Sequence, residues 1–198
     1  PKTKKYFFII PCNNSQIRLR CRKLLPLLNV SLTPMVEKIK SSYSLLWIDK
    51  VAEVPKNAWN ALAVPLQTPF FEWDWLNNLE VSQSASAKSG WLPNHLTLWR
   101  DQTLIAVAPL YIKGHSYGEF VFDHQWADLA YRIGVEYYPK MLGMSPFTPA
   151  EGYRFLIAPG EDEDDITSLI LHEIDSFCKK QRISGCNFLY VDPDFRPV

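Results

Sequence analysis

The sequence predicts a single α/β (α+β) domain in which helices pack on a mixed β-sheet. β-rich runs alternate with segments of helical periodicity, an alternation typical of sheets covered by helices. Hydrophobic residues make up 47% of the 198 residues and aromatic residues 14%, which is enough for a packed core. The expected order is strand, two helices, hairpin, long insert, strand, helix, strand.

The first expected strand is the apolar run 44–48 (SLLWI), which should be buried. A short helix is expected over Pro55–Ala63, because a proline in the first helical turn loses no hydrogen bond. Thr68 and Pro69 predict the start of a second helix, which runs to about Glu80. The expected apolar face of that helix consists of Phe71, Trp75 and Leu79.

The clearest hairpin signal comes from two β-rich runs, His95–Arg100 and Thr103–Ile112, around a two-residue turn. Pro109 in the second run should mark an edge or a bulge, because proline cannot donate a hydrogen bond to a neighbouring strand. A further strand is expected over Tyr153–Ala158.

The strongest helix signal follows five consecutive carboxylates at Glu161–Asp165, and Gly185 should end this helix. Acidic residues at its start and basic residues within 179–182 match the helix dipole. Its apolar stripe consists of Ile166, Leu169, Ile170, Ile174, Phe177 and Cys178. A final strand is expected over Asn187–Val191.

Charge is distributed unevenly, although the formal net charge is zero. Residues 1–36 contain seven Lys/Arg and no Asp/Glu, so the rest of the chain carries 14 basic against 21 acidic residues. An acidic body argues against a DNA-binding surface. We expect a basic, poorly ordered leader over 1–40 and the folded domain over 41–198. The leader is either a targeting segment or sequence upstream of a folded protein that begins at Met35.

The sequence shows no sign of a membrane span, a signal peptide or a metal site. No apolar run approaches the ~18–20 residues that a membrane-spanning helix needs, and Phe7–Ile10 is too short for a signal-peptide core. The cysteines lack CxxC or CxxH spacing, which favours reduced thiols. They are Cys12, Cys21, Cys178 and Cys186. Together these features favour a cytoplasmic protein.

The most informative segment for function is Lys113–Gly152, which is rich in aromatic and ionisable side chains. Connecting loops in compact domains are usually about four to six residues long. A long irregular segment of this composition is typical of a recognition surface.

His115 and Glu119 are the candidate catalytic residues in this segment. A histidine titrates near neutral pH and can take a proton from an attacking amine, while a nearby carboxylate can orient and charge its ring. The alternative is a loop histidine that is hydrogen-bonded to the backbone. Lys113 and Ser116 of the same stretch are candidate substrate contacts.

Further candidate substrate contacts lie downstream. Asp123 and Trp126 can bind an amine, the carboxylate holding the ammonium group and the ring forming an apolar wall. The alternative is a structural turn in which Asp123 caps the backbone and Trp126 belongs to the core. Tyr138 and Lys140 can present a phenol and an ammonium group to an anionic or sugar-like substrate.

Three blocks of the chain resemble a known family. WLPNHLTLWR, APLYIKGHSYGEFVFDHQWADLAY and YYPKMLGMSPFTPAEGYRFLI are similar to the N-terminal half of the FemAB-like predicted N-acyltransferases. This family is also described as peptidoglycan biosynthesis/recognition proteins and belongs to the GNAT acyltransferase superfamily. The resemblance covers about Ser44–Val191.

The resemblance implies a GNAT-like mixed sheet flanked by helices, present here as an incomplete domain without a second GNAT-like half. In acyl-CoA-using members, a glycine-rich loop and a helix N-terminus hold the pyrophosphate. This chain has Ala158–Asp165 at that place, and its five carboxylates would repel a diphosphate. We therefore expect this half to bind no cofactor, with acyl-CoA or aminoacyl-tRNA as the donor for the full-length family.

The sequence thus predicts the N-terminal half of an N-acyltransferase that passes an acyl group to an amine, with 113–152 lining the acceptor pocket. The expected partners are an amine-bearing small molecule or a peptidoglycan precursor, and a second GNAT-like half or another copy of the chain. Two alternatives stay open: a non-catalytic recognition module for a peptidoglycan precursor, and an inactive fragment.

Overall fold

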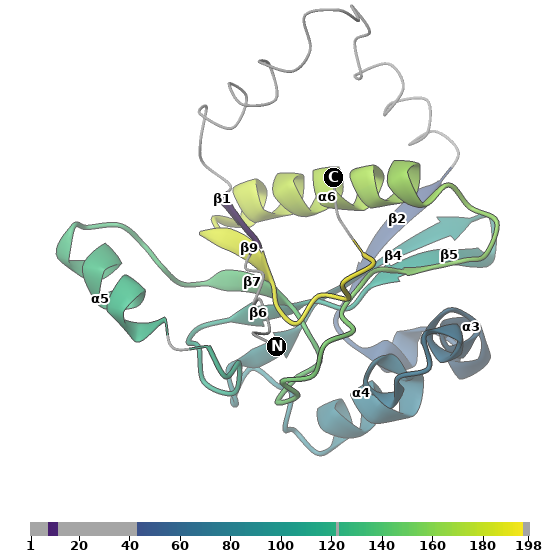
Figure 1. Ribbon diagram of the computed structural model, residues 1–198, viewed down its shortest axis with the longest axis horizontal. Helices are drawn as coiled ribbons and strands as arrows, with labels where there is room; N and C mark the ends of the chain where they lie inside the picture. Colours follow the sequence, from purple (N-terminus) through teal and green to yellow (C-terminus); the bar gives the residue numbers. More distant parts are fainter. Residues whose placement is uncertain (1–7, 12–42, 122, 196–198) are drawn as a thin grey trace, which may run out of the picture.

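The computed structural model describes residues 8–11, 43–121 and 123–195 (Figure 1). Its α-helices are α3 (Lys56–Ala63), α4 (Trp73–Val81), α5 (His124–Arg132) and α6 (Glu163–Gln181), with short 3-10 turns at Val51–Glu53, Val64–Leu66 and Pro69–Phe71. Helix α6 lies across one side of the strands, while α3 and α4 lie on the opposite side and α5 projects away from the body. Helices on both sides of the strands confirm the predicted α/β (α+β) class, which is consistent with a GNAT-like fold.

One sheet has four strands, β2 (Ser44–Ile48), β4 (His95–Arg100), β5 (Thr103–Ala108) and β8 (Leu156–Ile157). They are antiparallel neighbours in the order β2–β4–β5–β8. The predicted hairpin is confirmed, with Asp101 at a φ of +53° in the turn between β4 and β5. The run 44–48 is a strand as predicted, but it is partly exposed because it lies at the edge of the sheet.

The second sheet has five strands, β1 (Phe8–Pro11), β3 (Trp91–Pro93), β6 (Tyr111–Lys113), β7 (Lys140–Gly143) and β9 (Gly185–Phe188). Their order is β1–β9–β7–β6–β3, with β7 and β9 parallel and the other neighbours antiparallel. The chain crosses from β5 to β6 at Pro109 and Leu110, so the second run of the predicted hairpin contributes to both sheets. Pro109 ends a strand, as expected for a residue without an N–H donor.

The prediction that Lys113–Gly152 is irregular is wrong. The segment contains helix α5 and the interior strand β7, all four of whose residues are buried. Strand β7 is missed by periodicity because both of its faces are covered, which removes the alternation of polar and apolar residues. The strand expected over 153–158 is shorter, at Leu156–Ile157, and the strand expected over 187–191 lies two residues earlier, at Gly185–Phe188.

Helix α6 is the element that the sequence predicts best. The Asp162 carboxylate accepts a hydrogen bond from the Asp165 backbone N–H (3.0 Å) and caps the helix. The predicted apolar stripe enters the main core, where all of its members except the partly buried Phe177 are buried. The helix ends at Arg182, whose φ of +57° is left-handed, and not at Gly185, which opens β9.

The second predicted helix is broken into two parts. Pro69 opens a 3-10 turn, Glu72 is extended, and α4 begins only at Trp73. A hydrogen bond from α3 stabilises this break: the Asn60 side-chain oxygen accepts it from the Trp73 backbone N–H (2.8 Å). Because α4 starts later than predicted, Leu76 and Glu80 face inward and are buried. The Trp75 ring, which was expected on the apolar face, is exposed.

A buried side-chain hydrogen bond joins α4 to the four-stranded sheet. His95 is fully buried on β4, and its Nε2 lies 3.2 Å from Glu80 Oε1. The His95 Nδ1 accepts from the Leu110 backbone N–H (3.0 Å), so Nε2 carries the proton that is donated to Glu80. The other Glu80 oxygen accepts from the Val51 backbone N–H (3.0 Å). This carboxylate thereby joins a 3-10 turn, a helix and a strand.

No helix in the described ranges combines the length and the apolar composition needed to cross a bilayer.

We predict that Glu80→Ala lowers the free energy of unfolding by about 2–4 kcal/mol, because it leaves two buried donors without an acceptor. Urea denaturation followed by tryptophan fluorescence measures this change. The control is Asp74→Ala on the same helix, where the carboxylate is half-exposed and pairs with Lys56. It should cost less than about 1 kcal/mol. Equal losses in the two variants would contradict the structural role of Glu80.

Candidate functional site

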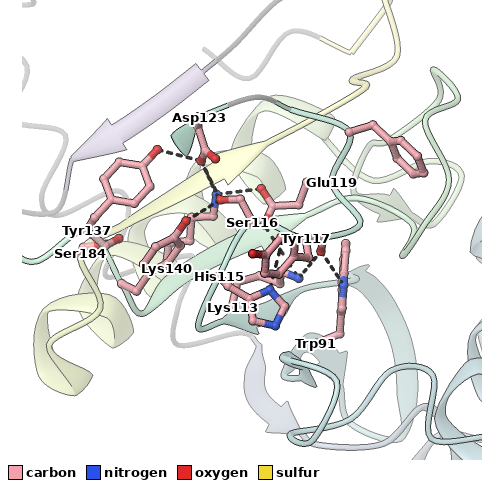
Figure 2. Close-up of polar contacts among 12 residues, drawn as sticks. Trp91, Lys113, His115, Ser116, Tyr117, Glu119, Asp123, Tyr137, Lys140 and Ser184 are labelled. Carbon is pink, nitrogen blue, oxygen red and sulfur yellow. Dashed lines mark hydrogen bonds and ion pairs between the residues drawn. The ribbon is translucent and has the colours of Figure 1, made fainter. Parts of the chain in front are cut away.

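Two lysines face each other at the end of the five-stranded sheet. Lys113 is the last residue of β6 and Lys140 the first of β7, and they are direct partners in the antiparallel register. Both side chains are buried, so two ammonium groups in these places would repel each other strongly. The loop 114–123 between β6 and α5 brings carboxylates and hydroxyls to them (Figure 2). We name this group the two-lysine cluster; it consists of Lys113, Ser116, Glu119, Asp123, Tyr137, Tyr138 and Lys140.

Lys140 is the centre of the cluster. Its Nζ donates to Glu119 Oε2 (2.7 Å), Asp123 Oδ2 (2.9 Å) and Ser116 Oγ (2.7 Å), which uses all three of its protons. The tyrosines add a second layer, since Tyr137 OH donates to Asp123 Oδ2 (2.9 Å) and Tyr138 OH lies 2.8 Å from Ser116 Oγ. Lys140 therefore holds both acids, which arrive from the loop, against the start of β7.

Lys113 has weaker charge partners than Lys140. Its Nζ lies 3.6 Å from the centroid of the Trp91 ring, donates to the Tyr117 carbonyl (3.0 Å) and lies 3.9 Å from Glu119 Oε1. The ring and the carboxylate favour the ammonium form, but the loss of water around a fully buried group opposes it more strongly. Burial, with a contribution from Lys140, lowers the pKa of Lys113 to about 7.

The two acids of the cluster are shifted in opposite directions. Burial raises the pKa of Glu119, although Lys140 and Lys113 act against the shift. Burial alone would also raise the pKa of Asp123, but hydrogen bonds from Lys140, Ser116 and Tyr137 together lower it. Asp123 is thus held ionised, whereas Glu119 is the acid whose charge depends on its neighbours.

One oxygen of each acid is left without a hydrogen bond. Glu119 Oε1 and Asp123 Oδ1 are buried and have no hydrogen-bond partner among the described residues. A buried carboxylate oxygen accepts strongly, and leaving it unmatched costs free energy. A water molecule, or an amine or hydroxyl group of a ligand, would satisfy these two oxygens.

Most of the predicted site residues meet in this cluster, but two of them do not. His115 lies apart from Glu119: its Nδ1 accepts from the Tyr117 backbone N–H (3.2 Å), and its ring packs on Gly90. The backbone-bonded alternative thus describes its geometry. Burial and nearby Lys113 lower the pKa of His115, and the catalytic roles of His115 and Glu119 stay predictions.

Trp126 is the second residue outside the cluster. It lies on α5 with its side chain 66% exposed, so the alternative that it belongs to the core is wrong. The alternative that Asp123 caps the backbone of a structural turn does not describe its geometry, because Asp123 precedes α5 and its side chain makes no capping hydrogen bond there. The carboxylate contacts Lys140 and Ser116 instead.

The sequence does not reveal the role of Trp91. This residue is fully buried on β3, directly opposite Lys113, and its Nε1 donates to the Tyr117 carbonyl (3.1 Å). Its contact with a lysine depends on the pairing of β3 with β6. Tyr190 adds a second support, since its OH donates to the Glu119 carbonyl (3.1 Å).

The described residues contain no group of three or more His, Cys, Asp or Glu side chains placed to hold a metal ion.

We predict that Lys140→Met destabilises the protein by about 3–5 kcal/mol, because it leaves two buried carboxylates without their shared cation. Thermal and urea unfolding measure the loss. Lys179→Met on α6 is the matched control, since Lys179 pairs with Asp175 on the exposed surface. Lys179→Met should lower the free energy of unfolding by no more than about 0.5 kcal/mol. A small effect of Lys140→Met would mean that the cluster is not the electrostatic centre described above.

We further predict that stability depends on pH through Lys113. The folded pKa of about 7 lies below the ordinary value of 10.5, so the unfolded chain binds more protons between these values. The contribution of Lys113 to stability should therefore rise as the pH increases from 7 toward 9.5, and it should be constant and unfavourable below 7. Urea midpoints of the wild type and Lys113→Met over this range measure the difference. Urea midpoints that change in parallel with pH in the two proteins would contradict a lowered pKa of Lys113.

A family model described as peptidoglycan biosynthesis/recognition, the FemAB-like family, matches residues 50–197. The match includes the whole two-lysine cluster and every described strand that follows β2. No curated protein matches the chain. Since the family model covers most of the sequence, the chain belongs to the FemAB-like family.

Proposed function

We propose that the two-lysine cluster is the acceptor site of an N-acyl transfer in which an amine of a peptidoglycan precursor receives the acyl group. The observation that carries this proposal is the pair of buried oxygens without a hydrogen bond, Glu119 Oε1 and Asp123 Oδ1, beside a lysine with a pKa of about 7. The description of the family supports a peptidoglycan precursor as the ligand.

The chemistry needs an ammonium group that is first held and then deprotonated. The two free oxygens can accept hydrogen bonds from the ligand's ammonium group. The amine then loses one proton, its nitrogen bonds to the acyl carbon, and the bond from that carbon to the donor's oxygen or sulfur breaks. The nitrogen loses its second proton as the amide forms, and the leaving group takes up a proton. Lys113 is suited to hold the amine's proton, because a pKa of about 7 gives it a substantial neutral fraction at neutral pH.

Entry to this site requires a movement of the loop 114–123. The Lys113 and Glu119 side chains are 0% and 1% exposed, so an amine cannot reach them in the conformation shown in Figure 2. Such a closed site excludes water, which strengthens every charge interaction inside it. Opening and closing of the loop would then be part of the binding step.

We propose that the acyl donor is bound outside the described part of this chain. At the N-terminus of α6, Glu161 binds Arg100 (2.7 Å) and Tyr43 (3.0 Å), and the Asp162 carboxylate caps the helix. These acids occupy the positive end of the helix dipole, where a diphosphate would otherwise bind. Acyl-CoA or aminoacyl-tRNA would then be held by a second GNAT-like half or by another copy of the chain.

A recognition module without catalysis is the second candidate. The observation that favours it is the saturation of Lys140, whose three protons are all taken by residues of the chain itself. Incubation of the chain with an acyl-CoA, or with a charged aminoacyl-tRNA, and a free-amine muropeptide separates the two. A mass increase of the muropeptide shows transfer, whereas binding without a mass increase shows recognition alone.

We predict that the protein distinguishes a free amine from a blocked one. Isothermal titration should show a muropeptide with a free diamino-acid amine binding at least about tenfold tighter than its N-acetylated form, which cannot make a charged hydrogen bond. The double variant Glu119→Gln/Asp123→Asn should lose this preference.

The matched control is Asp128→Asn, an exposed acid on α5, which should keep the preference. Equal affinity of the wild type for the two muropeptides would contradict the proposal that the two-lysine cluster is an acceptor site. The proposal would also be contradicted if the double variant still bound the free-amine muropeptide more tightly.

A further inference from the structure

Three rings form a row on the outer side of the loop 114–123, in which Tyr117 and His124 are exposed and His115 is half-buried. The ring of Tyr117 lies 5.0 Å from that of His115 and 6.0 Å from that of His124, as measured between centroids. Tyr117 is 68% exposed, although it lies between two residues of the closed cluster in sequence. Figure 2 shows His115 and Tyr117 beside each other, next to Lys113.

The backbone fixes the outward direction of the Tyr117 ring. Its carbonyl points inward and accepts from both Lys113 Nζ (3.0 Å) and Trp91 Nε1 (3.1 Å). Gly118 follows at a φ of +80°, and a Cβ there would lie 2.7 Å from the Phe147 ring. Because the Tyr117 carbonyl and the next residue are constrained, the backbone that carries the ring does not need to be ordered on binding.

We propose that Tyr117, flanked by His115 and His124, is a stacking platform for a sugar ring of the ligand. This inference rests on the proposed function and deepens it, since it assigns the saccharide part of a peptidoglycan precursor to the outer face of the same loop. A pyranose presents a flat face of C–H groups that packs on an aromatic ring, and its hydroxyls can bond to the phenol and the imidazoles at the rim.

The chemistry of the surroundings favours a sugar over other flat ligands. The part of the chain after residue 36 carries more acidic than basic residues, which disfavours the phosphates that accompany stacked bases. All three side chains of the row end in polar atoms that can bond to sugar hydroxyls. A glycan needs both properties at once, an uncharged ring face and hydrogen-bonding groups beside it.

The row is also continuous with the acceptor site. Lys113 binds the carbonyl of Tyr117 from inside, and Ser116, the preceding residue, contacts Lys140 and Asp123. A ligand whose sugar lies on Tyr117 would therefore have its peptide amine directed to the inner side of the same loop.

The test uses three probes: a muropeptide with its sugar, the same peptide without the sugar, and a chitin-type oligosaccharide alone. Tyr117→Ala should weaken binding of the sugar-bearing muropeptide by about five- to tenfold, the range expected for one aromatic contact. It should leave the affinity for the bare peptide unchanged. Tyr117→Phe, which keeps the ring, should stay close to the wild type.

Tyr131→Ala is the matched control, because Tyr131 is 87% exposed on α5 and lies outside the ring row. Unfolding midpoints check that Tyr117→Ala folds, which is expected since its carbonyl contacts come from the backbone. An unchanged affinity of Tyr117→Ala for the sugar-bearing probe overturns the platform, even if Glu119→Gln/Asp123→Asn abolishes amine discrimination. Oligosaccharide binding that depends on Tyr117, without any amine discrimination, supports the platform while the acceptor site fails.

Discussion

The face-to-face pairing of Lys113 with Lys140 is the constraint on which the candidate site depends. Two buried ammonium groups on neighbouring strands are tolerable only if negative charge reaches them, and the strands themselves supply none. The loop places Glu119 and Asp123 over the strand ends, where both bind Lys140, and the pKa of Lys113 is lowered. The loop path, the outward ring of Tyr117 and the closure of the site all follow from this electrostatic requirement.

The two sheets share the main apolar core, and the candidate site lies on one of them. The core includes Met141 of β7 and Cys186 and Phe188 of β9 together with residues of the four-stranded sheet, α3, α4 and α6, and the two-lysine cluster lies on the five-stranded sheet beside a smaller apolar cluster. Pro109 and Leu110 connect the two, and the Leu110 backbone N–H is bound by His95 of the main core. The candidate site is therefore attached directly to the main core, which fixes its position.

The sequence predicted those features that depend on residues close together along the chain. Helix α6 follows from its cap and its stripe, and the β4–β5 hairpin from its turn. The pairing of β3, β6 and β7 could not be predicted, because strands of three or four residues are too short to carry a clear periodic signal. The contact of Trp91 with Lys113 depends on that pairing. Spacing placed Glu119 near His115, but the cost of burying unpaired lysines directs its carboxylate to Lys140 instead.

The opposition of Lys113 and Lys140 also limits the routes by which this sequence can evolve. Replacing Lys140 alone leaves two buried carboxylates unmatched, and replacing both carboxylates leaves Lys140 unmatched. Exchanging all four charged residues for apolar ones of similar volume avoids both costs, so the effects of single changes are far from additive. We therefore expect related chains to have all four charged residues or none of them. Selection should act against a chain with only some of the four, even where the ligand is no longer used.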